Sequence, residues 1–202
     1  MKEIIIATQN AHKATEIAAI LPQGCTIRTL ADFPDIEAPE ETGHSFAENA
    51  AQKAQALSER VDGWVLADDS GLCVDALSGS PGILSARYAG SHGDDAANNR
   101  KLLTELAALP GLAPFSARFV CAMCLAKEGK VLAEFQGVLE GHITLQPRGA
   151  HGFGYDPLFI PMGTNGSTLA ELSADEKNSI SHRARALRQL AQWVSLHTDQ
   201  HS

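Results

Sequence analysis

The N-terminal segment limits the possible folds more than any other part of the sequence. Lys2–Thr8 carries three consecutive isoleucines, which is typical of a buried strand, and a polar loop follows at Gln9–Lys13. Beyond the loop, Ile17, Ile20 and Leu21 recur at helical spacing. A strand, a loop and a helix in this order favour an α/β fold. They also place backbone N–H groups and the positive end of a helix dipole at the loop, where an anion can bind.

Helical and strand patterns alternate along the rest of the chain, and a hairpin follows them. We therefore expect an α/β fold with a mixed central sheet, helices on both sides, and two lobes around an active-site cleft, all within a single domain of residues 1–202. The expected elements are a helix capped at Ser45 that runs to about Arg60, a strand from Trp64 that leads into a sharp acidic turn at Asp68–Ser70, a helix at Asp94–Leu109, strands at Ala117–Ala126 and Val131–Leu139, and a helical region capped by Ser173 and Glu176.

The charge balance excludes some classes of partner. The chain has 16 Lys+Arg against 24 Asp+Glu, a net charge of −8, which is the wrong sign for a protein that holds long nucleic acid by its phosphates. A small polyanion can bind only where local basic residues or a cation overcome this field. No apolar stretch approaches the roughly 20 residues needed to cross a bilayer. We expect a cytoplasmic protein without a membrane segment.

A Cys-x-x-Cys pair allows a redox or a zinc function in principle. Cys121 and Cys124 lie within ARFVCAMCLA, which has the pattern of a strand, whereas a redox pair usually begins a helix. A structural zinc site also needs two further ligands at similar spacing, and the sequence offers none. Burial of both thiols in the core is the favoured interpretation, with a thiol-redox protein as the alternative.

Four polar clusters at loops or element ends are candidates for chemistry. The loop Thr8–Lys13 has a hydroxyl, an amide and an ammonium suited to phosphate, although Asn10 is equally suited to cap the helix. The loop has no glycine and is not a P-loop. Adjacent carboxylates at Asp68 and Asp69 suit Mg²⁺, with a simple polar turn as the alternative. The remaining clusters are Glu40 and Glu41 with Glu48 and Asn49, and Phe153–Asp156 with Lys177, His182 and Arg183.

The last of these clusters predicts a break in the C-terminal helix. In one straight helix, Lys177 and His182 would point about 140° apart, from the 100° turn per residue, and could not share a ligand easily. Asn178–Ser181 is rich in residues that weaken a helix. We therefore expect the helix to break there, with Ser181 able to cap the second piece.

Taken together, these motifs resemble one family, the inosine triphosphate pyrophosphatases, which act on non-standard purine nucleotides. The matching stretches run in family order over almost the whole chain: ATQNAHKATEI, EETGHSFAENAAQKA, LADDSGLCVDAL, PGILSARYAG, GFGYDPLF and AELSADEKNSISHRARAL. The resemblance implies a mixed α/β fold, a homodimer, and Mg²⁺-dependent attack of water on the α-phosphorus. The expected reaction converts ITP, dITP or XTP to the monophosphate and pyrophosphate.

The resemblance also implies roles for individual residues. Glu40 or Glu41 and Asp69 are similar to the family's metal and general-base pair, with Asp68 as a second possible base, and Ser70 is expected to contact the substrate. Gln9 departs from the glycine that many members carry, which affects only the detailed loop contact. The residues expected to bind phosphate are Thr8, Gln9, Asn10, Ala11, His12 and Lys13, and those expected to form the nucleoside pocket are Phe153, Gly154, Tyr155, Asp156, Lys177, His182 and Arg183.

Hydrogen-bond polarity suggests how the base is chosen. Hypoxanthine and xanthine present an acceptor at the 6-position, where adenine presents an amino donor. His182 and Arg183 are donors, so adenine would leave them unpaired at a cost of roughly 1–3 kcal/mol per buried group. Two alternatives stay open from sequence: a nucleotide sensor, which the presence of all four acids weighs against, and a pyrophosphatase for modified pyrimidine nucleotides.

Overall fold

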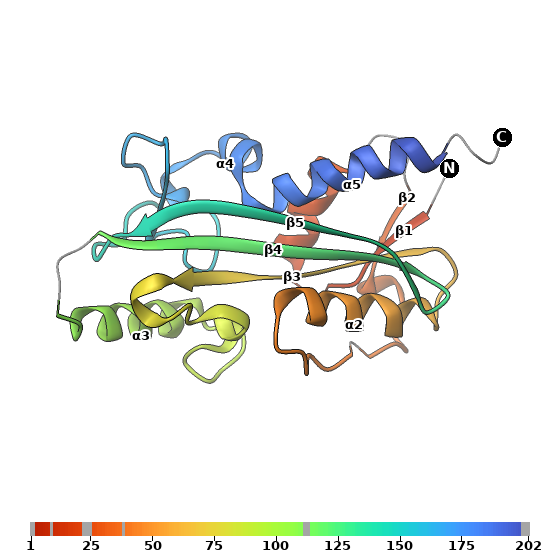
Figure 1. The fold of residues 1–202 in the computed structure, drawn as a ribbon, viewed down its shortest axis with the longest axis horizontal. Coiled ribbons are helices and arrows are strands. Elements are labelled where there is room, and N and C mark those ends of the chain that lie inside the picture. The colour runs from red at the N-terminus through yellow and green to blue at the C-terminus, as the bar shows by residue number, and fades with distance from the viewer. Residues whose placement is uncertain (1–2, 9, 22–25, 38, 111–113, 199–202) are drawn as a thin grey trace. The chain divides into compact units, whose positions relative to one another are not determined.

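The computed structural model describes residues 3–8, 10–21, 26–37, 39–110 and 114–198 (Figure 1). Strands and helices alternate through the first half of the chain, and two long strands follow as a hairpin. In chain order the elements are β1 (Glu3–Ile6), α1 (Ala11–Ile20), β2 (Thr26–Thr29), α2 (Phe46–Ser58), β3 (Trp64–Val74), α3 (Asp95–Ala107), β4 (Phe115–Lys127), β5 (Lys130–Ile143), β6 (Phe159–Pro161), α4 (Ala174–Ile180) and α5 (His182–Thr198).

The strands form one mixed sheet in the order β2-β1-β3-β4-β5-β6. β1 pairs in parallel with both β2 and β3, and β5 pairs antiparallel with β6. The predicted hairpin between β4 and β5 is confirmed: Glu128 and Gly129 both have positive φ, at 52° and 72°, as a tight hairpin turn requires. The predicted mixed α/β fold is therefore confirmed.

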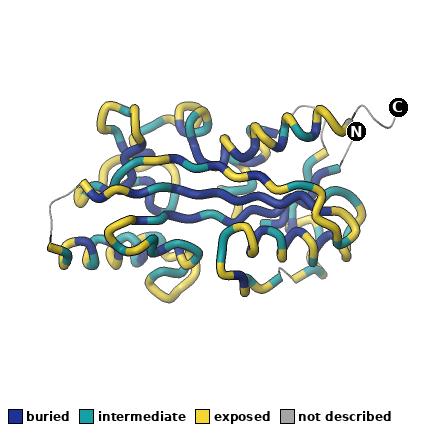
Figure 2. The backbone as a smooth tube through the Cα atoms, viewed as in Figure 1, coloured by how far each residue is buried: buried dark blue, intermediate teal, exposed yellow. Residues whose placement is uncertain are grey.

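Two compact units divide the chain, and β3, β4 and β5 each contribute to both. The first unit comprises residues 1–69, 121–137 and 182–202, and the second comprises residues 70–120 and 138–181. The expectation of two lobes thus agrees with two units, while the cleft stays a prediction. The central strands of the sheet are largely buried along their length (Figure 2).

In the first unit, helices cover both faces of the sheet. Side chains of a strand alternate between faces. Accordingly, Ile4, Ile6 and Leu66 pack with Ile17 of α1 and with Leu187 and Leu190 of α5. Ile5, Val65 and Ala67 pack instead with Ala50, Ala54 and Leu57 of α2. The predicted placement of helices on both sides of the sheet is confirmed here.

Close packing of α5 on β5 depends on Gly137. A Cβ at that position would lie 1.9 Å from the His182 carbonyl oxygen and 2.8 Å from the Ala186 nitrogen. Only glycine permits this approach of helix to strand. This close approach of α5 to β5 positions the N-terminal turn of α5, which carries His182 and Arg183.

The second unit has a core of its own. Leu72 and Val74 of β3 and Phe119 of β4 pack with Leu102 and Leu106 of α3. Phe119 and Phe159 approach to 4.7 Å between ring centroids. Tyr155 and Leu158, from the loop before β6, belong to the same cluster, so this core anchors the loop.

The predicted acidic turn at Asp68–Ser70 is wrong, because β3 continues through these residues to Val74. The local sequence Asp-Asp-Ser-Gly favours a turn, but each acid has partners that satisfy it in an extended strand. Gly71 is not a turn residue either: a Cβ there would lie 2.3 Å from Ser85 Oγ. Glycine in this strand permits the close approach of Ser85, whose hydroxyl accepts from the Leu72 N–H at 2.9 Å.

The cysteine pair lies in the core, as favoured from the sequence. Cys121 and Cys124 are both buried and free, and burial raises the pKa of each thiol to about 12. Because the two are three residues apart in β4, their side chains point to opposite faces, Cys121 toward α5 and Cys124 toward α2. The geometry gives them no shared redox or metal function. Cys25 lies outside the described residues.

The predicted break in the C-terminal helix is confirmed. α4 ends at Ile180, Ser181 has ψ of 155°, and α5 begins at His182. The predicted capping box at Ser173 and Glu176 is also present, with both of its hydrogen bonds.

Candidate functional site

The loop between β1 and α1 is the predicted anion site. Asn10 caps α1 by accepting from the N–H groups of His12 and Lys13 at 3.0 and 3.2 Å, and Thr8 Oγ1 accepts from the Asn10 N–H at 3.2 Å. Asn10 takes up two first-turn N–H groups, but the positive end of the α1 dipole still favours an anion at this loop. Ala11 and His12 are exposed there. Gln9 lies outside the described residues.

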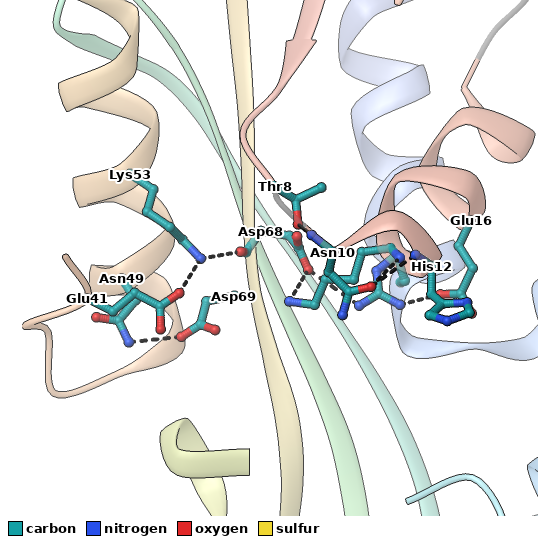
Figure 3. Close-up of polar contacts among 11 residues, drawn as sticks. Thr8, Asn10, His12, Glu16, Glu41, Asn49, Lys53, Asp68 and Asp69 are labelled. Atoms are coloured by element: carbon teal, nitrogen blue, oxygen red, sulfur yellow. Dashed lines mark hydrogen bonds and ion pairs between the residues drawn. The ribbon is translucent and has the colours of Figure 1, made fainter. Parts of the chain in front are cut away.

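β3 passes this loop and carries the two acids just beyond the end of β1. The last paired residues are Ile6 and Leu66, followed by a bond from the Ala7 N–H to the Leu66 carbonyl at 2.8 Å. Asp68 and Asp69 are therefore the next acidic side chains along β3, and they point to opposite faces of the sheet. Figure 3 shows them on the two sides of the strand, Asp68 toward Asn10 and Asp69 toward Asn49.

Nearby cations hold Asp68 in its ionised form near neutral pH. It is 2% exposed, and its Oδ2 lies 3.1 Å from Lys13 Nζ and 3.4 Å from Arg183 Nη2. Burial alone would raise the pKa of Asp68, but the charges of Lys13, Arg183 and Lys53 lower it far below its ordinary value. An acid that does not take up a proton near neutral pH is a poor general base. Asp68 instead fixes the position of the Lys13 ammonium.

Arg183 ties this pair to α1. It is 1% exposed, and its second ion pair is with Glu16 of α1. A buried guanidinium needs such partners, because an unpaired buried charge costs several kcal/mol. Arg183 therefore connects α1, β3 and α5 within the first unit. Its expected contact with a purine base stays a prediction.

Asp69 has a different environment on the α2 face. Its Oδ2 accepts from Asn49 Nδ2 at 2.9 Å. Lys53 Nζ forms an ion pair with Glu41 Oε1 at 2.7 Å and donates to the Asp68 carbonyl at 2.6 Å. Burial raises the pKa of Asp69; Lys53 and Asn49 oppose the rise, and the negative charge of Glu41 adds to it. Of the two adjacent acids, Asp69 is the one suited to accept a proton.

Charge interactions join the two faces into one site. Burial would lower the pKa of Lys53, but the negative charges of Asp68, Asp69 and Glu41 raise it above its ordinary value. Lys13 in turn acts on Asp69 from the anion-loop side. Charges in a partly buried site interact over several ångströms, so the charged groups on the two faces influence each other's pKa values.

The acids offer a magnesium ion a partial set of ligands. In the described part of the chain, His, Cys, Asp and Glu side chains do not gather in a ready cluster of three or more. Mg²⁺, however, commonly uses one or two carboxylates, several waters and the substrate's phosphates. Glu41 and Asp69 are close enough for Glu41 to raise the pKa of Asp69, and a cation between them would relieve that repulsion. Glu40 is exposed, which favours Glu41 as the ligand.

The second unit holds the aromatic loop Phe153–Asp156. Asp156 Oδ2 accepts from Lys177 Nζ at 2.7 Å and from the Phe153 N–H at 2.9 Å. Lys177 Nζ also lies 4.6 Å from the centroid of the Phe153 ring, a cation–π contact. Tyr155 is 4% exposed and donates its hydroxyl proton to the Ser85 carbonyl at 2.9 Å. Asp156 thus holds the loop, and its predicted contact with the nucleoside stays a prediction.

The structure brings part of the predicted site together. In the first unit, one network joins Thr8, Asn10, Lys13, Asp68 and Arg183, and Glu41 and Asp69 lie on the opposite face of the sheet. His182 is buried at the start of α5, and Ser70 lies in β3 next to Asp69. Phe153–Asp156 and Lys177 form their own network in the second unit. A pocket common to all of these residues stays a prediction.

Two residues of the site were missed from the sequence, Lys53 and Glu16. Lys53 follows Asn49 by four residues and so shares its helix face, beside the apolar Ala50, Ala54 and Leu57. A lysine next to a buried stripe was a usable signal. Glu16 follows Lys13 by three residues and has the pattern of an ordinary surface ion pair. The role of Glu16 in the site depends on its ion pair with Arg183, which is distant in the sequence.

The fold and the site define a class: α/β proteins with a candidate anion-binding loop at the carboxyl end of a parallel strand, here β1. The family model described as the Ham1 family matches residues 4–193. The chain belongs to the Ham1 family. Among the described residues, none of the helices combines the length and apolar character needed to cross a bilayer.

Known relatives cover nearly the whole chain. A protein of Halalkalibacterium halodurans named dITP/XTP pyrophosphatase is 50% identical over 195 residues, which cover 96% of this chain and 100% of that protein. A Bacillus subtilis protein of the same name is 48% identical over 195 residues, covering 96% and 98%. The solved structure of a HAM1 protein from Coxiella burnetii matches with a TM-score of 0.87 and 40% identity, covering 96% and 99%.

Proposed function

We propose that this chain hydrolyses non-standard purine nucleoside triphosphates, ITP, dITP and XTP, to the monophosphate and pyrophosphate, and so removes them from the nucleotide pool. The observation that carries the proposal is the pair Asp68 and Asp69, whose pKa values shift in opposite directions beside an anion loop. Such a pair gives one acid that stays charged and holds a lysine, and one that takes a proton. Relatives named dITP/XTP pyrophosphatase support the substrate class.

In the reaction, a water oxygen bonds to the α-phosphorus and the bond to the β-phosphate's bridging oxygen breaks. Asp69 accepts the proton of the attacking water, and Lys13 and Lys53 neutralise charge on the polyphosphate. The positive end of the α1 dipole favours the phosphates at this loop. Glu41 and Asp69 would hold Mg²⁺, which when bound polarises phosphate oxygens and lowers the pKa of water from about 15.7.

Selection of the base falls to donor groups. We assign the nucleoside to Phe153, Gly154, Tyr155 and Lys177 with His182 and Arg183, and the substrate's sugar or phosphate to Ser70. An acceptor at the purine 6-position satisfies such donors, and an amino group there leaves them unpaired, at roughly 1–3 kcal/mol per buried group. A factor of about 10–100 between ITP and ATP follows, since each 1.4 kcal/mol is tenfold.

A substrate panel tests the proposed function. We expect pyrophosphate release from ITP, dITP and XTP to exceed that from ATP and dUTP by at least about tenfold in kcat/KM. GTP has the same 6-position acceptor as ITP, so any discrimination against it must come from its 2-amino group. The measurement is initial-rate pyrophosphate release at matched concentrations with Mg²⁺. Faster hydrolysis of dUTP than of ITP would favour the modified-pyrimidine alternative, and equal rates with all nucleotides would contradict donor-based selection.

Removal of the metal tests the role given to Glu41 and Asp69. We expect EDTA to lower the rate of ITP hydrolysis at least about a hundredfold, because the acids then face the polyphosphate without a cation. Added Mg²⁺ should restore the rate. The Glu41→Gln variant should need a higher Mg²⁺ concentration for half its maximal rate, whereas Glu40→Gln should match the wild type. The reverse order would assign the ligand to Glu40.

The same proposal includes a homodimer in the cytoplasm. The resemblance of the motifs to the inosine triphosphate pyrophosphatases supports both assignments. Sedimentation velocity, which gives the mass in solution, tests the homodimer. A monomer at micromolar concentration would exclude the homodimer.

A further inference from the structure

One face of α3 holds both backbone polar groups of Gly154. Asp95 Oδ2 accepts from the Gly154 N–H at 2.6 Å, and Asn99 Nδ2 donates to the Gly154 carbonyl at 2.9 Å. Asp95 and Asn99 are four residues apart in α3, so their side chains project from the same face. An acid faces the donor and an amide faces the acceptor. The two contacts therefore match the polarity of this glycine residue.

The conformation that they hold is one that a free loop would rarely keep. Gly154 has φ of +63°, in the left-handed region, and glycine samples more conformations than any other residue. A Cβ built on Gly154 would meet no atom within 4 Å, so the requirement for glycine comes from the backbone angle and not from crowding. The same observation shows that this side of the loop is open, which leaves room for a ligand to approach the backbone.

The interior of a helix is an unfavourable place for this asparagine. Asn has a lower helix propensity than Ala, and the Asn99 Oδ1 is buried without a hydrogen-bond partner in the part of the chain described. Its bond to Gly154 is the contact in which its polar side chain takes part. The residue is thus better explained by the loop that it holds than by the helix in which it lies.

We propose that Asp95 and Asn99 are positioning residues for nucleoside binding, which hold Gly154 so that the Phe153 ring keeps its orientation. Asp156 fixes the other side of the same loop through Lys177 and the Phe153 N–H. The loop is therefore held between α3 and α4, and the α3 contacts are those made to the backbone of the glycine itself. This inference rests on the proposed function in assigning Phe153–Asp156 to the nucleoside.

Binding of two simple probes tests it. Inosine monophosphate reports on the nucleoside side and inorganic pyrophosphate on the phosphate side, each by calorimetry with the full chain. In Asn99→Asp a carboxylate faces the Gly154 carbonyl, so we expect the Kd for inosine monophosphate to rise about tenfold or more. The Kd for pyrophosphate should change less than about twofold, because the anion loop and its lysines belong to the first unit. The KM for ITP should rise with kcat nearly unchanged.

Matched variants separate positioning from general damage. Arg100→Gln makes the same change in net charge at the next residue of α3, which is exposed, and should bind both probes as the wild type does. Asn99→Ala removes the donor while favouring the helix, with an expected weakening for inosine monophosphate of about three- to tenfold. Asp95→Asn keeps an acceptor for the Gly154 N–H and should bind better than Asp95→Ala.

Wild-type affinity for inosine monophosphate in both Asn99 variants would overturn the inference. Equal loss of pyrophosphate binding would also overturn it, because the effect would then be a general one on the fold. A wild-type chain that released no pyrophosphate from ITP would instead count against the proposed function. The two failures are therefore distinguishable.

Discussion

We expect Asp69→Asn to lower kcat for ITP by about a thousandfold while the chain stays folded. Removal of a general base typically costs 10²–10⁴ in rate, and Asp69 is proposed to hold the metal as well. The amide of Asn keeps an oxygen that can accept from Asn49 Nδ2, so the local packing is preserved. Single-turnover pyrophosphate release and the melting temperature, measured on the same preparation, check both halves of the prediction.

The stability of this variant provides a further check with a definite sign. The native pKa of Asp69 is raised, mainly by burial, so its charged form is disfavoured in the fold at neutral pH. Replacement by a neutral amide should therefore leave the metal-free protein as stable as the wild type or more stable. Asp62→Asn, on an exposed residue just before β3, is the control for the change of charge. Turnover within tenfold of the wild type would remove Asp69 from the mechanism.

Local signals predicted the parts of the fold that depend on local chemistry. Asn10 and Asp94 cap their helices, because a side-chain oxygen at that position satisfies an N–H group of the first turn. The β4–β5 hairpin follows from Glu128 and Gly129 between two long apolar strands. β2 and β6 were not predicted. They are four and three residues long, too short to show a period, and only their neighbours in the sheet define them.

The continuity of β3 could not be predicted, for a reason that concerns the site itself. Asp68, Asp69 and Ser70 follow local turn preferences, and what overrides them is a set of partners distant in sequence. Lys13 and Arg183 hold Asp68, and Asn49 holds Asp69. Local rules commonly fail where a protein places charged groups for function. The division of labour between the two acids was left open for the same reason, since it depends on which face each residue occupies.

Asp68→Asn should lower the stability of the fold, whereas Asp69→Asn should leave it unchanged or raise it. It leaves Arg183 and Lys13 without their shared buried counter-charge, and loss of one partner of a buried ion pair typically costs about 3–5 kcal/mol. For a chain of this size, 3 kcal/mol corresponds to a fall in melting temperature of roughly 6–12 °C. Catalysis should fall as well, because Lys13 loses the carboxylate that fixes the position of its ammonium.

The difference in unfolding free energy between the wild type and Asp68→Asn should depend on pH. The sign of that dependence shows whether cations stabilise the charged form of Asp68. The charges of Lys13, Arg183 and Lys53 lower the native pKa of Asp68 below the ordinary value of 3.8, against the effect of burial. A depressed native pKa contributes stability that is fully present above the unfolded value and is lost as the pH falls through the native one. The gap between wild type and Asp68→Asn, measured by urea unfolding in EDTA, should therefore be constant from pH 7 to about 5 and shrink below about 4. A gap that grew on acidification would mean that Asp68 is protonated more readily in the fold than in the unfolded chain, which is incompatible with two cations at 3.1 and 3.4 Å.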